Sequence, residues 1–273
     1  MTDLFWVRVP RDFVRVSGPD AATFLQGQMS QDIEAVRTRG SAWSFLLQPQ
    51  GKVDAWVRVS MHGDDEYVLD VERGFGEAVI ARLNRFKLRV KVDIAPLEWQ
   101  CVAVRGDGAA AVDGLAAEWP GIEAVDVVGP DPAVDFGRAG SREDYERERI
   151  RAGVPAMGSE ITTSTIPGEL GVNDRSVSFT KGCYTGQELV ARVDSRGGNV
   201  PRHLRLVQVD GDAPVGAPVE HDGREVGSLT SVVTDDGRTI ALAMLARSVE
   251  PPAEVVVRAD HAELVAHVTA LPG

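Results

Sequence analysis

The stretch KGCYTGQELVAR, residues 181–192, places a lysine, a cysteine, a tyrosine, two glycines and a glutamate within eight consecutive positions. Gly182 and Gly186 permit a turn or a close approach between backbones. Thr185 and Glu188 have the spacing of a capping box at the start of a helix. The segment therefore predicts a glycine-containing loop that leads directly into a helix through QELVAR.

Cys183 is one of only two cysteines in the chain, and it lies just ahead of the predicted helix. Free N–H groups at a helix N-terminus favour a thiolate, and the positive charge of Lys181 would act in the same direction. The residues alone leave a second interpretation open. In that interpretation Cys183 fills a tight loop-to-helix junction, and Lys181 and Glu188 are a surface pair and a helix cap.

The composition of the whole chain limits the classes of function. Its 273 residues include 29 basic and 41 acidic side chains, which gives a net charge of −12. A protein that binds nucleic acid through its charge normally has a basic face, so direct nucleic-acid binding is not expected. The apolar and charged fractions, 43% and 26%, are typical of a soluble globular protein, and the length predicts two or three domains.

The apolar runs and the cysteines indicate the compartment. No run is long enough for a signal peptide or a membrane span, so we expect a cytoplasmic protein without a membrane partner. Cys101 and Cys183 are typical of a reducing compartment, where a free thiol is the default. Cys101 lies in a predicted strand, and we interpret it as a small buried residue. The cysteines and the five histidines lack the spacing of zinc or iron-sulfur sites, so no tightly bound metal is expected.

Hydrophobic periodicity predicts strands and helices in alternation over the first part of the chain. Residues 17–28 begin with capping residues and continue as an apolar-periodic helix. Residues 41–47 and 53–60 predict two strands around a turn. The apolar stripe in 74–86 indicates an amphipathic helix, and the alternation in 87–94 predicts a strand with one buried and one exposed face.

The second half of the chain changes in character near residue 201. Residues 141–153 have a Ser-x-x-Asp capping box, charges at helical spacing and a glycine stop, which together predict a helix of about ten residues. After residue 201, short apolar segments alternate with Gly, Pro and Asp turns, and no helical pattern interrupts them. This pattern predicts a small antiparallel β-barrel or sandwich.

The motif and its flanks resemble a known family. KGCYTGQE, with VSFT before it and LVAR after it, resembles the signature of the YgfZ family of folate-binding-like proteins, which are related to the aminomethyltransferase of the glycine cleavage system (T-protein, GcvT). Further segments match the family in the same order along the chain: VSGPDAATFLQGQMSQDI (16–33), LNRFKLRVKVDI (83–94), RIRAGVPAMG (149–158), TIPGEL (165–170) and VGSLTSVV (226–233). The resemblance thus covers most of the chain.

The resemblance implies an α+β fold of the GcvT/YgfZ type. In such a fold two α/β lobes surround a central channel, and a C-terminal antiparallel β-barrel completes a three-lobed ring. On this chain we expect the first lobe over residues 1–98, the second over 99–200 with the KGCYTGQE motif, and the barrel over 201–273. The two lobes can be interleaved in sequence.

The resemblance also implies a function. It points to a role in assembling or repairing iron-sulfur enzymes, including those that modify tRNA, and to tetrahydrofolate or a related folate in the channel. The implied partners are a folate-like small molecule and iron-sulfur client or assembly proteins. The mitochondrial iron-sulfur assembly factors look similar over the same motif.

The matched motif assigns roles to individual residues. Function in the family is thought to depend on the motif cysteine, which is Cys183 here, with Lys181 and Tyr184 as its catalytic neighbours. Gly182 and Gly186 are the motif glycines. The residues that the resemblance implies for ligand binding are Gln187, Glu188, Glu169, Arg149, Arg151 and Asp54.

One segment departs from the aminomethyltransferase pattern. The transferases have a Gly-x-(Ile/Val/Leu)-Asp-Asp-Leu segment whose aspartate acts in the folate nitrogen chemistry. This chain has GKVDAWV at 51–57 and keeps one aspartate, Asp54. Asp54 alternates out of phase with the inward-facing positions if Ala55 and Val57 face the core, so aminomethyl transfer loses its principal acid or base.

A second departure concerns the ligand. The family pattern Arg-x-Glu-Ala-Gly becomes Arg149-Ile-Arg151-Ala-Gly in this chain. Arg151 then stands where a carboxylate would hold a pterin ring, and an unpaired buried donor costs about 1–3 kcal/mol. Glu169, in the matched IPGE segment, could take the place of that carboxylate.

The residues and the resemblance together leave three functions open for this chain. The preferred one is a YgfZ-like protein that supports iron-sulfur enzymes through the reactive thiol of Cys183 beside a folate-type channel. The first alternative is a folate-dependent aminomethyltransferase or demethylase, which the missing aspartate pair and Arg151 disfavour. The second alternative is a non-catalytic ligand-binding scaffold in which Cys183 is structural.

Overall fold

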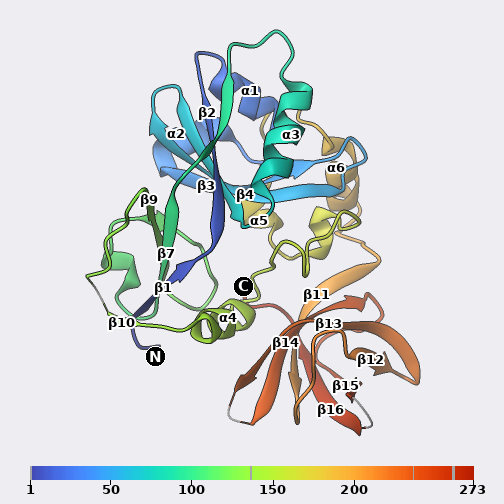
Figure 1. Cartoon of the computed structure of the whole chain (residues 1–273). Helices are drawn as coiled ribbons and strands as arrows, with labels where there is room; N and C mark the ends of the chain where they lie inside the picture. The colour runs from blue at the N-terminus through green and yellow to red at the C-terminus, as the bar shows by residue number, and fades with distance from the viewer. Residues whose placement is uncertain (1, 136, 236, 260–261) are drawn as a thin grey trace.

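The computed structural model describes residues 2–135, 137–235, 237–259 and 262–273. Within these residues the strands form two five-stranded sheets and one closed six-stranded barrel. Figure 1 shows the first sheet with its helices at the top, the second sheet below it on the left, and the barrel at the bottom. Helix α4 (Arg142–Arg151) lies between the second sheet and the barrel.

The first sheet is antiparallel and runs in the order β3-β4-β5-β2-β6. Its strands are β2 (Arg11–Ser17), β3 (Ser41–Leu47), β4 (Val53–Gly63), β5 (Glu66–Glu72) and β6 (Asp93–Leu97). One face packs against α1 (Ala21–Gln28), α2 (Ile33–Arg39) and α3 (Gly76–Phe86), which bury their apolar stripes in a shared core. The strand predictions at 41–47 and 53–60 and the helix predictions at 17–28 and 74–86 are confirmed, within a few residues at the ends.

The second sheet runs in the order β10-β1-β7-β9-β8. Its strands are β1 (Phe5–Val9), β7 (Gln100–Arg105), β8 (Leu115–Ala116), β9 (Ala124–Gly129) and β10 (Arg138–Ala139). Strand β1 pairs with β7 although all five strands of the first sheet, β2 to β6, lie between them in sequence. We retain the lobe division near residues 98 and 200 as a proposal, with β1 as the segment in which the lobes interleave.

The two sheets enclose aromatic side chains and a buried ion network. Trp43 and Trp56 stack with their ring centroids 4.2 Å apart. The guanidinium of Arg58 is fully buried and pairs with Asp70 at 2.9 Å and with Asp126 of the second sheet at 2.8 Å. A buried charge that loses its partner is strongly destabilising, so these pairs fix one sheet against the other.

The C-terminal strands close into an antiparallel barrel in the order β11-β14-β13-β12-β15-β16. Its strands are β11 (Arg202–Val209), β12 (Pro218–His221), β13 (Arg224–Asp235), β14 (Arg238–Ala246), β15 (Ala253–Ala259) and β16 (Ala262–Thr269). Valines and alanines that alternate along these strands fill its interior. The sequence prediction of a small antiparallel barrel is confirmed.

The remaining described elements are short. They are the 3₁₀ turns η1 (Ala109–Ala111) and η2 (Pro167–Glu169) and the helices α5 (Asn173–Ser176) and α6 (Gln187–Ser195). Helix α4 begins with the predicted capping box, in which Ser141 and Asp144 bond each other's backbone N–H groups. None of the described helices combines the length and the hydropathy that crossing a bilayer requires.

The strand predicted for residues 87–94 is largely wrong. Residues 87–92 have no regular structure, and the sheet is rejoined only by β6 at Asp93. Arg89 has a φ of +58°, which is outside the strand region, and Leu88 is 76% exposed. The alternation of apolar and charged residues was therefore not evidence of a half-buried strand here.

Candidate functional site

The KGCYTGQE motif forms a loop that ends in α6. Gly186 is the residue before the helix and has a φ of +82°, a left-handed conformation that favours glycine. No side chain caps the helix, so the predicted capping box of Thr185 and Glu188 is wrong. The physical reason is that the backbone turn at Gly186 carries the chain into the helix without a capping side chain. Cys183 consequently lies four positions before the first helical residue and not beside it.

The loop is seated on the turn between β3 and β4. A Cβ atom on Gly186 would lie 2.5 Å from the carbonyl oxygen of Gln48 and 2.7 Å from the Cβ of Leu47. A Cβ atom on Gly51 would lie 2.5 Å from the Cβ of Leu189 in α6. Two glycines from distant parts of the chain thus allow this contact, and the motif loop is fixed to the first sheet.

Lys181 fixes the other end of the loop. Its Nζ donates to the carbonyl oxygens of Gln26 and Met29 at 2.7 Å each and of Gln31 at 3.0 Å. Carbonyls at a helix C-terminus lack intrahelical donors and attract a cation, and these three surround the end of α1. Burial lowers the pKa of Lys181 to about 8, and Asp32 opposes that shift. Lys181 therefore acts as a positioning residue that clamps the loop to α1.

Tyr184 anchors the middle of the loop. It is 8% exposed and belongs to the core between the two sheets. Its ring centroid lies 5.2 Å from the Nζ of Lys181. Burial raises the pKa of Tyr184 to about 12, so the phenol keeps its proton at neutral pH and does not serve as a base.

The two cysteines differ in access. Cys183 is exposed, and Phe179, four positions earlier in the chain, is 48% exposed. Cys101 is 1% exposed, and burial raises the pKa of its thiol. The expectation that Cys101 is a buried structural residue is confirmed. In the folded chain the thiol of Cys183 is therefore accessible to a second molecule, and the thiol of Cys101 is not.

Asp54 lies at a β-bulge in β4. Leu46 pairs with Ala55 and Leu47 pairs with Val53, so Asp54 is the extra residue and has no partner in β3. A bulge re-aims a side chain relative to the alternation of its strand. The out-of-phase argument from Ala55 and Val57 therefore does not apply to Asp54, whose carboxylate lines a cavity on the helix-covered face of the sheet.

Arg82 holds the Asp54 carboxylate and was not found from the sequence. Its Nε donates to Asp54 Oδ2 at 3.0 Å, and its two terminal nitrogens donate to Gln28 Oε1 at 3.0 Å and to the Leu47 carbonyl at 2.9 Å. Arg82 is 7% exposed although it lies beside Leu83 on the apolar side of α3. An arginine on the buried side of an amphipathic helix was the signal that could have revealed it.

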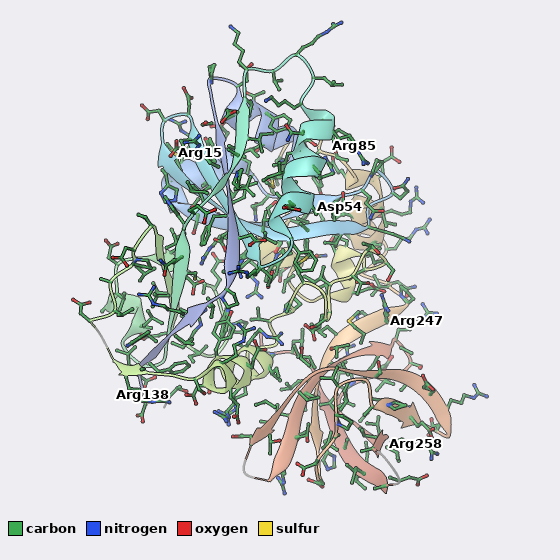
Figure 2. All side chains as sticks on the ribbon, viewed as in Figure 1. Arg15, Asp54, Arg85, Arg138, Arg247 and Arg258 are labelled. Atoms are coloured by element: carbon green, nitrogen blue, oxygen red, sulfur yellow. The ribbon has the colours of Figure 1, made fainter. Side chains whose placement is uncertain are left out.

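The cavity at Asp54 has a volume of about 590 Å³. Its walls are mostly apolar and come from α3, from the β3–β4 hairpin and from residues 157–163. Its polar groups are Asp54, Arg82, Arg85 and the threonines Thr162 and Thr163. Figure 2 shows Asp54 and Arg85 on the side of the first sheet that α3 covers. An apolar cavity with a few fixed polar groups is the usual form of a small-molecule site.

The cavity and the cysteine loop share a neighbour. Gln28, the last residue of α1, accepts from Arg82 in the cavity wall, while Lys181 of the loop bonds the carbonyls of Gln26, Met29 and Gln31. The end of α1 thus contacts both features. Gln28 links it to the Arg82–Asp54 pair, and the neighbouring carbonyls link it to Lys181.

Arg149 lies elsewhere and already has partners for its donors. It is 5% exposed and donates to Glu146 at 2.7 Å, to the Val154 carbonyl at 2.6 Å and to Ser231 Oγ at 2.7 Å. Ser231 in turn donates to Glu160 at 2.7 Å. These bonds join α4, the following loop and the barrel, which gives Arg149 a structural role at that junction.

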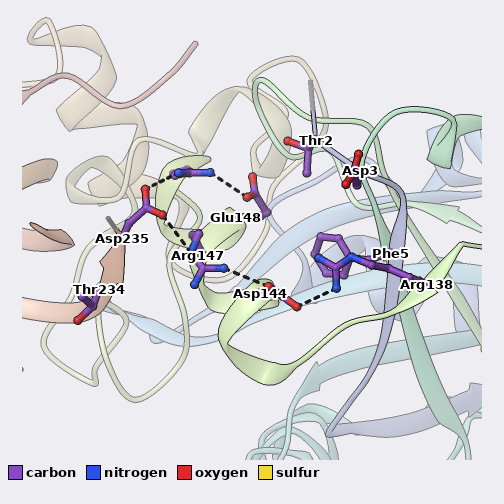
Figure 3. Close-up of a pocket in the computed structure, with 10 residues that line it drawn as sticks. Thr2, Asp3, Phe5, Arg138, Asp144, Arg147, Glu148, Thr234 and Asp235 are labelled. Carbon is purple, nitrogen blue, oxygen red and sulfur yellow. Dashed lines mark hydrogen bonds and ion pairs between the residues drawn. The ribbon is translucent and has the colours of Figure 1, made fainter. Parts of the chain in front are cut away.

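Arg151 belongs to an ion network between α4 and the barrel. It pairs with Glu148 at 3.1 Å and with Asp235 of β13, and Arg147 also pairs with Asp235 at 3.4 Å. Figure 3 shows Arg147, Glu148 and Asp235 around a cavity of about 440 Å³. This cavity and the Asp54 cavity have no wall residue in common. Arg151 therefore does not face Asp54.

Glu169, Gln187 and Glu188 are not gathered at the Asp54 cavity. Glu169 is 3% exposed, accepts from the Ile166 N–H at 3.1 Å and pairs with Arg202 at 2.9 Å. Gln187 begins α6 and accepts from the Tyr184 N–H at 3.4 Å, and Glu188 is exposed. Of the implied ligand residues, only Asp54 lines that cavity.

No protein-family model matches the chain. Several curated proteins are similar to it. The protein named tRNA-modifying protein YgfZ from Yersinia enterocolitica is 27% identical over an alignment of 295 positions, which covers 95% of this chain and 89% of that protein. An uncharacterized protein from Haemophilus influenzae is 27% identical over 232 positions, with 82% of each chain covered.

The mitochondrial iron-sulfur cluster assembly factor IBA57 homolog from Mycosarcoma maydis is 28% identical over 216 positions. That match covers 70% of this chain and 54% of the fungal protein, so the chain spans about half the length of this relative. The chain is thus similar to proteins named tRNA-modifying protein YgfZ and to IBA57 homologs. The resemblance that the KGCYTGQE motif suggested is confirmed.

A solved structure shares the fold of this chain. It is the glycine cleavage system aminomethyltransferase T from Bartonella henselae, with a TM-score of 0.81 and 17% sequence identity. The superposition covers 99% of this chain and 86% of that chain. The α+β, three-lobed fold class that the sequence predicted is confirmed.

Proposed function

We propose that this chain supports the assembly or repair of iron-sulfur enzymes through the thiol of Cys183, and that it binds a folate-type ligand in the Asp54 cavity. The observation that carries the proposal is the exposed Cys183 on a loop that Lys181, Tyr184 and Gly186 fix from three sides. The names of its relatives, a tRNA-modifying protein and an iron-sulfur cluster assembly factor, support the same role.

The Asp54 cavity fits a folate-type ligand in its chemistry. Its apolar walls suit a flat aromatic ring system, and its volume of about 590 Å³ is within the range of small-molecule sites. Arg82 occupies one oxygen of Asp54, and no described residue donates a hydrogen bond to the other. That oxygen can accept from the amino and ring N–H groups of a pterin. Arg85 at the cavity edge supplies a positive charge for the glutamate portion.

A deletion strain tests the proposed function. Loss of the chain should lower the activity of [4Fe-4S] enzymes measured in cell extracts, and a plasmid copy of the chain should restore it. The activity of an iron-free enzyme in the same extracts serves as the control. Unchanged [4Fe-4S] activity in the deletion strain would contradict the proposal.

Binding of 5-formyltetrahydrofolate, a stable folate, should depend on Asp54. Asp54→Asn replaces an acceptor oxygen with a donor, which leaves a ligand N–H unpaired and costs about 1–3 kcal/mol, or about tenfold or more in affinity. Arg151→Glu should change the affinity by less than about threefold, because Arg151 lines a separate cavity. Isothermal titration calorimetry measures all three proteins. Equal affinities for wild type and Asp54→Asn would refute the site, and an absence of binding to wild type would refute the ligand.

Lys181→Met should loosen the motif loop. The change removes three hydrogen bonds from a charged donor, and each such bond contributes about 1.5–3 kcal/mol. Amide hydrogen exchange over residues 178–186 should accelerate by about tenfold or more, since the opening of this segment becomes easier. Lys52→Met, at an exposed lysine of the adjacent β3–β4 turn, is the matched control and should leave the exchange unchanged.

The same clamp should depend on pH. The Lys181 pKa of about 8 lies below the usual lysine value because burial disfavours the charged form, so the open loop binds more protons than the closed loop from about pH 8 upward. After correction for intrinsic exchange, wild-type protection over 178–186 should therefore rise as the pH increases through about 8. Lys181→Met should show no such step, and a step of equal size in that variant would assign the titration to another group.

A further inference from the structure

The segment between α3 and β6 gathers positive charge in an acidic protein. Arg85, Lys87, Arg89 and Lys91 fall within seven residues, whereas the whole chain has a net charge of −12. Figure 1 shows this segment as the loop that rises from the end of α3 at the top of the molecule. Arg85 also lines the Asp54 cavity and is therefore not counted with the other three. We call residues 87–91 the basic loop.

The charges of the basic loop have no acidic partner within the described chain. None of the ion pairs among the described residues includes Lys87, Arg89 or Lys91, although most arginines elsewhere in the chain are paired. Arg89 and Lys91 are exposed and Lys87 is half-buried. Figure 2 shows side chains with nitrogen ends reaching from this part of the molecule into solvent.

An exposed leucine lies among these charges. Leu88 is 76% exposed, the largest exposed fraction among the large apolar side chains of the described residues. A single exposed leucine is ordinary, but here it stands between cations that nothing neutralises. An apolar side chain ringed by unpaired charges has the arrangement of an interface anchor with a polar rim.

The basic loop is held in place at its base. Asp20 Oδ2 accepts from the Lys91 N–H at 2.7 Å, and a Cβ on Gly18 would lie 2.4 Å from the Lys91 carbonyl oxygen. Arg89 takes a left-handed φ of +58°, which turns the chain at the tip. A loop fixed in this way presents Leu88 without a large ordering cost on binding.

We propose that the basic loop is a docking surface for a partner protein that offers an apolar socket for Leu88 and an acidic rim for Lys87, Arg89 and Lys91. The positive charge of the basic loop is opposite to that of an acidic rim, which speeds the encounter of the two proteins and orients them. A nucleic-acid backbone would pair with the cations but would leave Leu88 against a polar surface, and the chain as a whole repels polyanions through its charge of −12. The proposal does not depend on the thiol or on the folate-type cavity.

Site-specific photocrosslinking tests the docking surface in living cells. The photoreactive residue p-benzoylphenylalanine replaces Leu88 in the full chain, and in a separate chain it replaces Val265, an exposed apolar residue on the barrel. Position 88 should give a discrete protein adduct that position 265 does not give. The partner peptide in that adduct, sequenced by mass spectrometry, should carry a cluster of acidic residues.

Charge reversal shows whether the cations take part. Adding Lys87→Glu and Arg89→Glu to the crosslinking chain should lower the yield of the adduct by about tenfold or more, because like charges then meet across the interface. Arg8→Glu with Arg224→Glu, at two exposed arginines outside the loop, is the matched control and should keep the yield. Both charge variants should keep the wild-type melting temperature and affinity for 5-formyltetrahydrofolate, since the loop lies outside the cavity.

Four results would overturn the proposal. They are the absence of a protein adduct from position 88, the same adduct from position 265, an adduct that ribonuclease removes, and an adduct whose yield survives the charge reversal. The third result would assign the loop to RNA. If the wild-type chain gives the adduct but does not bind folate, or if its deletion does not lower [4Fe-4S] activity, the proposed function fails and the docking surface stands. The two failures are therefore distinguishable.

Discussion

Gly186→Ala is expected to destabilise the folded chain by about 2–5 kcal/mol. A left-handed φ of +82° costs a residue with a Cβ about 1–2 kcal/mol. The new Cβ would also lie 2.5 Å from the Gln48 carbonyl and 2.7 Å from the Leu47 Cβ, and such overpacking costs about 1–3 kcal/mol. The two effects add because the strain is in the loop and the clash is against the β3–β4 turn.

The melting temperature measures this loss. For a chain of this size each kcal/mol lowers it by about 2–4 °C, so Gly186→Ala should melt about 4–20 °C below wild type in a circular dichroism scan. Gly182→Ala is the matched control from the same motif. A Cβ at Gly182 meets nothing within 4 Å, and Gly182 has no positive φ, so this variant should melt within about 2 °C of wild type. Equal melting temperatures for the two variants would show that the loop does not sit on the turn as described.

The fold could be predicted from the sequence because it depends on repeated local patterns. The alternation of apolar residues at 53–60 and the helical stripe at 74–86 each repeat several times, so a single exception does not change the outcome. The barrel was visible from the change in turn spacing after residue 201. The arrangement of the lobes came from the resemblance and not from these patterns, since contacts distant in sequence leave no local signal.

The prediction for residues 87–94 failed for a reason specific to that segment. Alternation of apolar and charged residues is typical of a strand, yet Leu88 and Arg89 stand at a turn that is fixed from outside by Gly18 and Asp20. A tertiary contact decided the backbone there, and strand propensity did not. The same contact leaves the charges of the basic loop without internal partners.

The site was only partly predictable. The motif predicted the loop and its glycines, but the exposure of Cys183 comes from the structure, and the role of Lys181 depends on three carbonyls about 150 residues away in sequence. The direction of the Asp54 side chain did not follow from the alternation of its strand, because Asp54 lies at a β-bulge that no sequence pattern predicts. Arg82 reaches Asp54 only because α3 packs across the first sheet, which the sequence of neither α3 nor β4 reveals.

The structure also changes the chemical argument for Cys183. The helix N-terminus lies four positions away, and the ammonium of Lys181 is committed to the end of α1. The two local effects that the sequence suggested for activating the thiol are therefore not arranged as expected. What remains is access: Cys183 is exposed on a fixed loop, so that a cluster, a persulfide or a partner thiol can reach it.

Cys183→Ala should abolish the support of iron-sulfur enzymes and leave the fold intact. The side chain is exposed, so its truncation opens no cavity and should change the free energy of unfolding by less than about 0.5 kcal/mol. Loss of function would then be chemical and not structural. The affinity for 5-formyltetrahydrofolate should also remain, because the cavity wall does not include Cys183.

Cys101→Ala is the matched control for the thiol. It removes the other cysteine, which is 1% exposed and lies in the core between the sheets. That change should cost about 1 kcal/mol of stability through a small cavity and should keep the function. A chain that works without Cys101 and fails without Cys183 would show that position, and not thiol content, determines activity.

The [4Fe-4S] enzyme activity in extracts of the deletion strain, with equal amounts of each variant verified by immunoblot, tests the role of Cys183 most directly. The strain that carries Cys183→Ala should show the same activity as the strain without any copy, while wild type and Cys101→Ala restore it. Full restoration by Cys183→Ala would contradict the thiol mechanism.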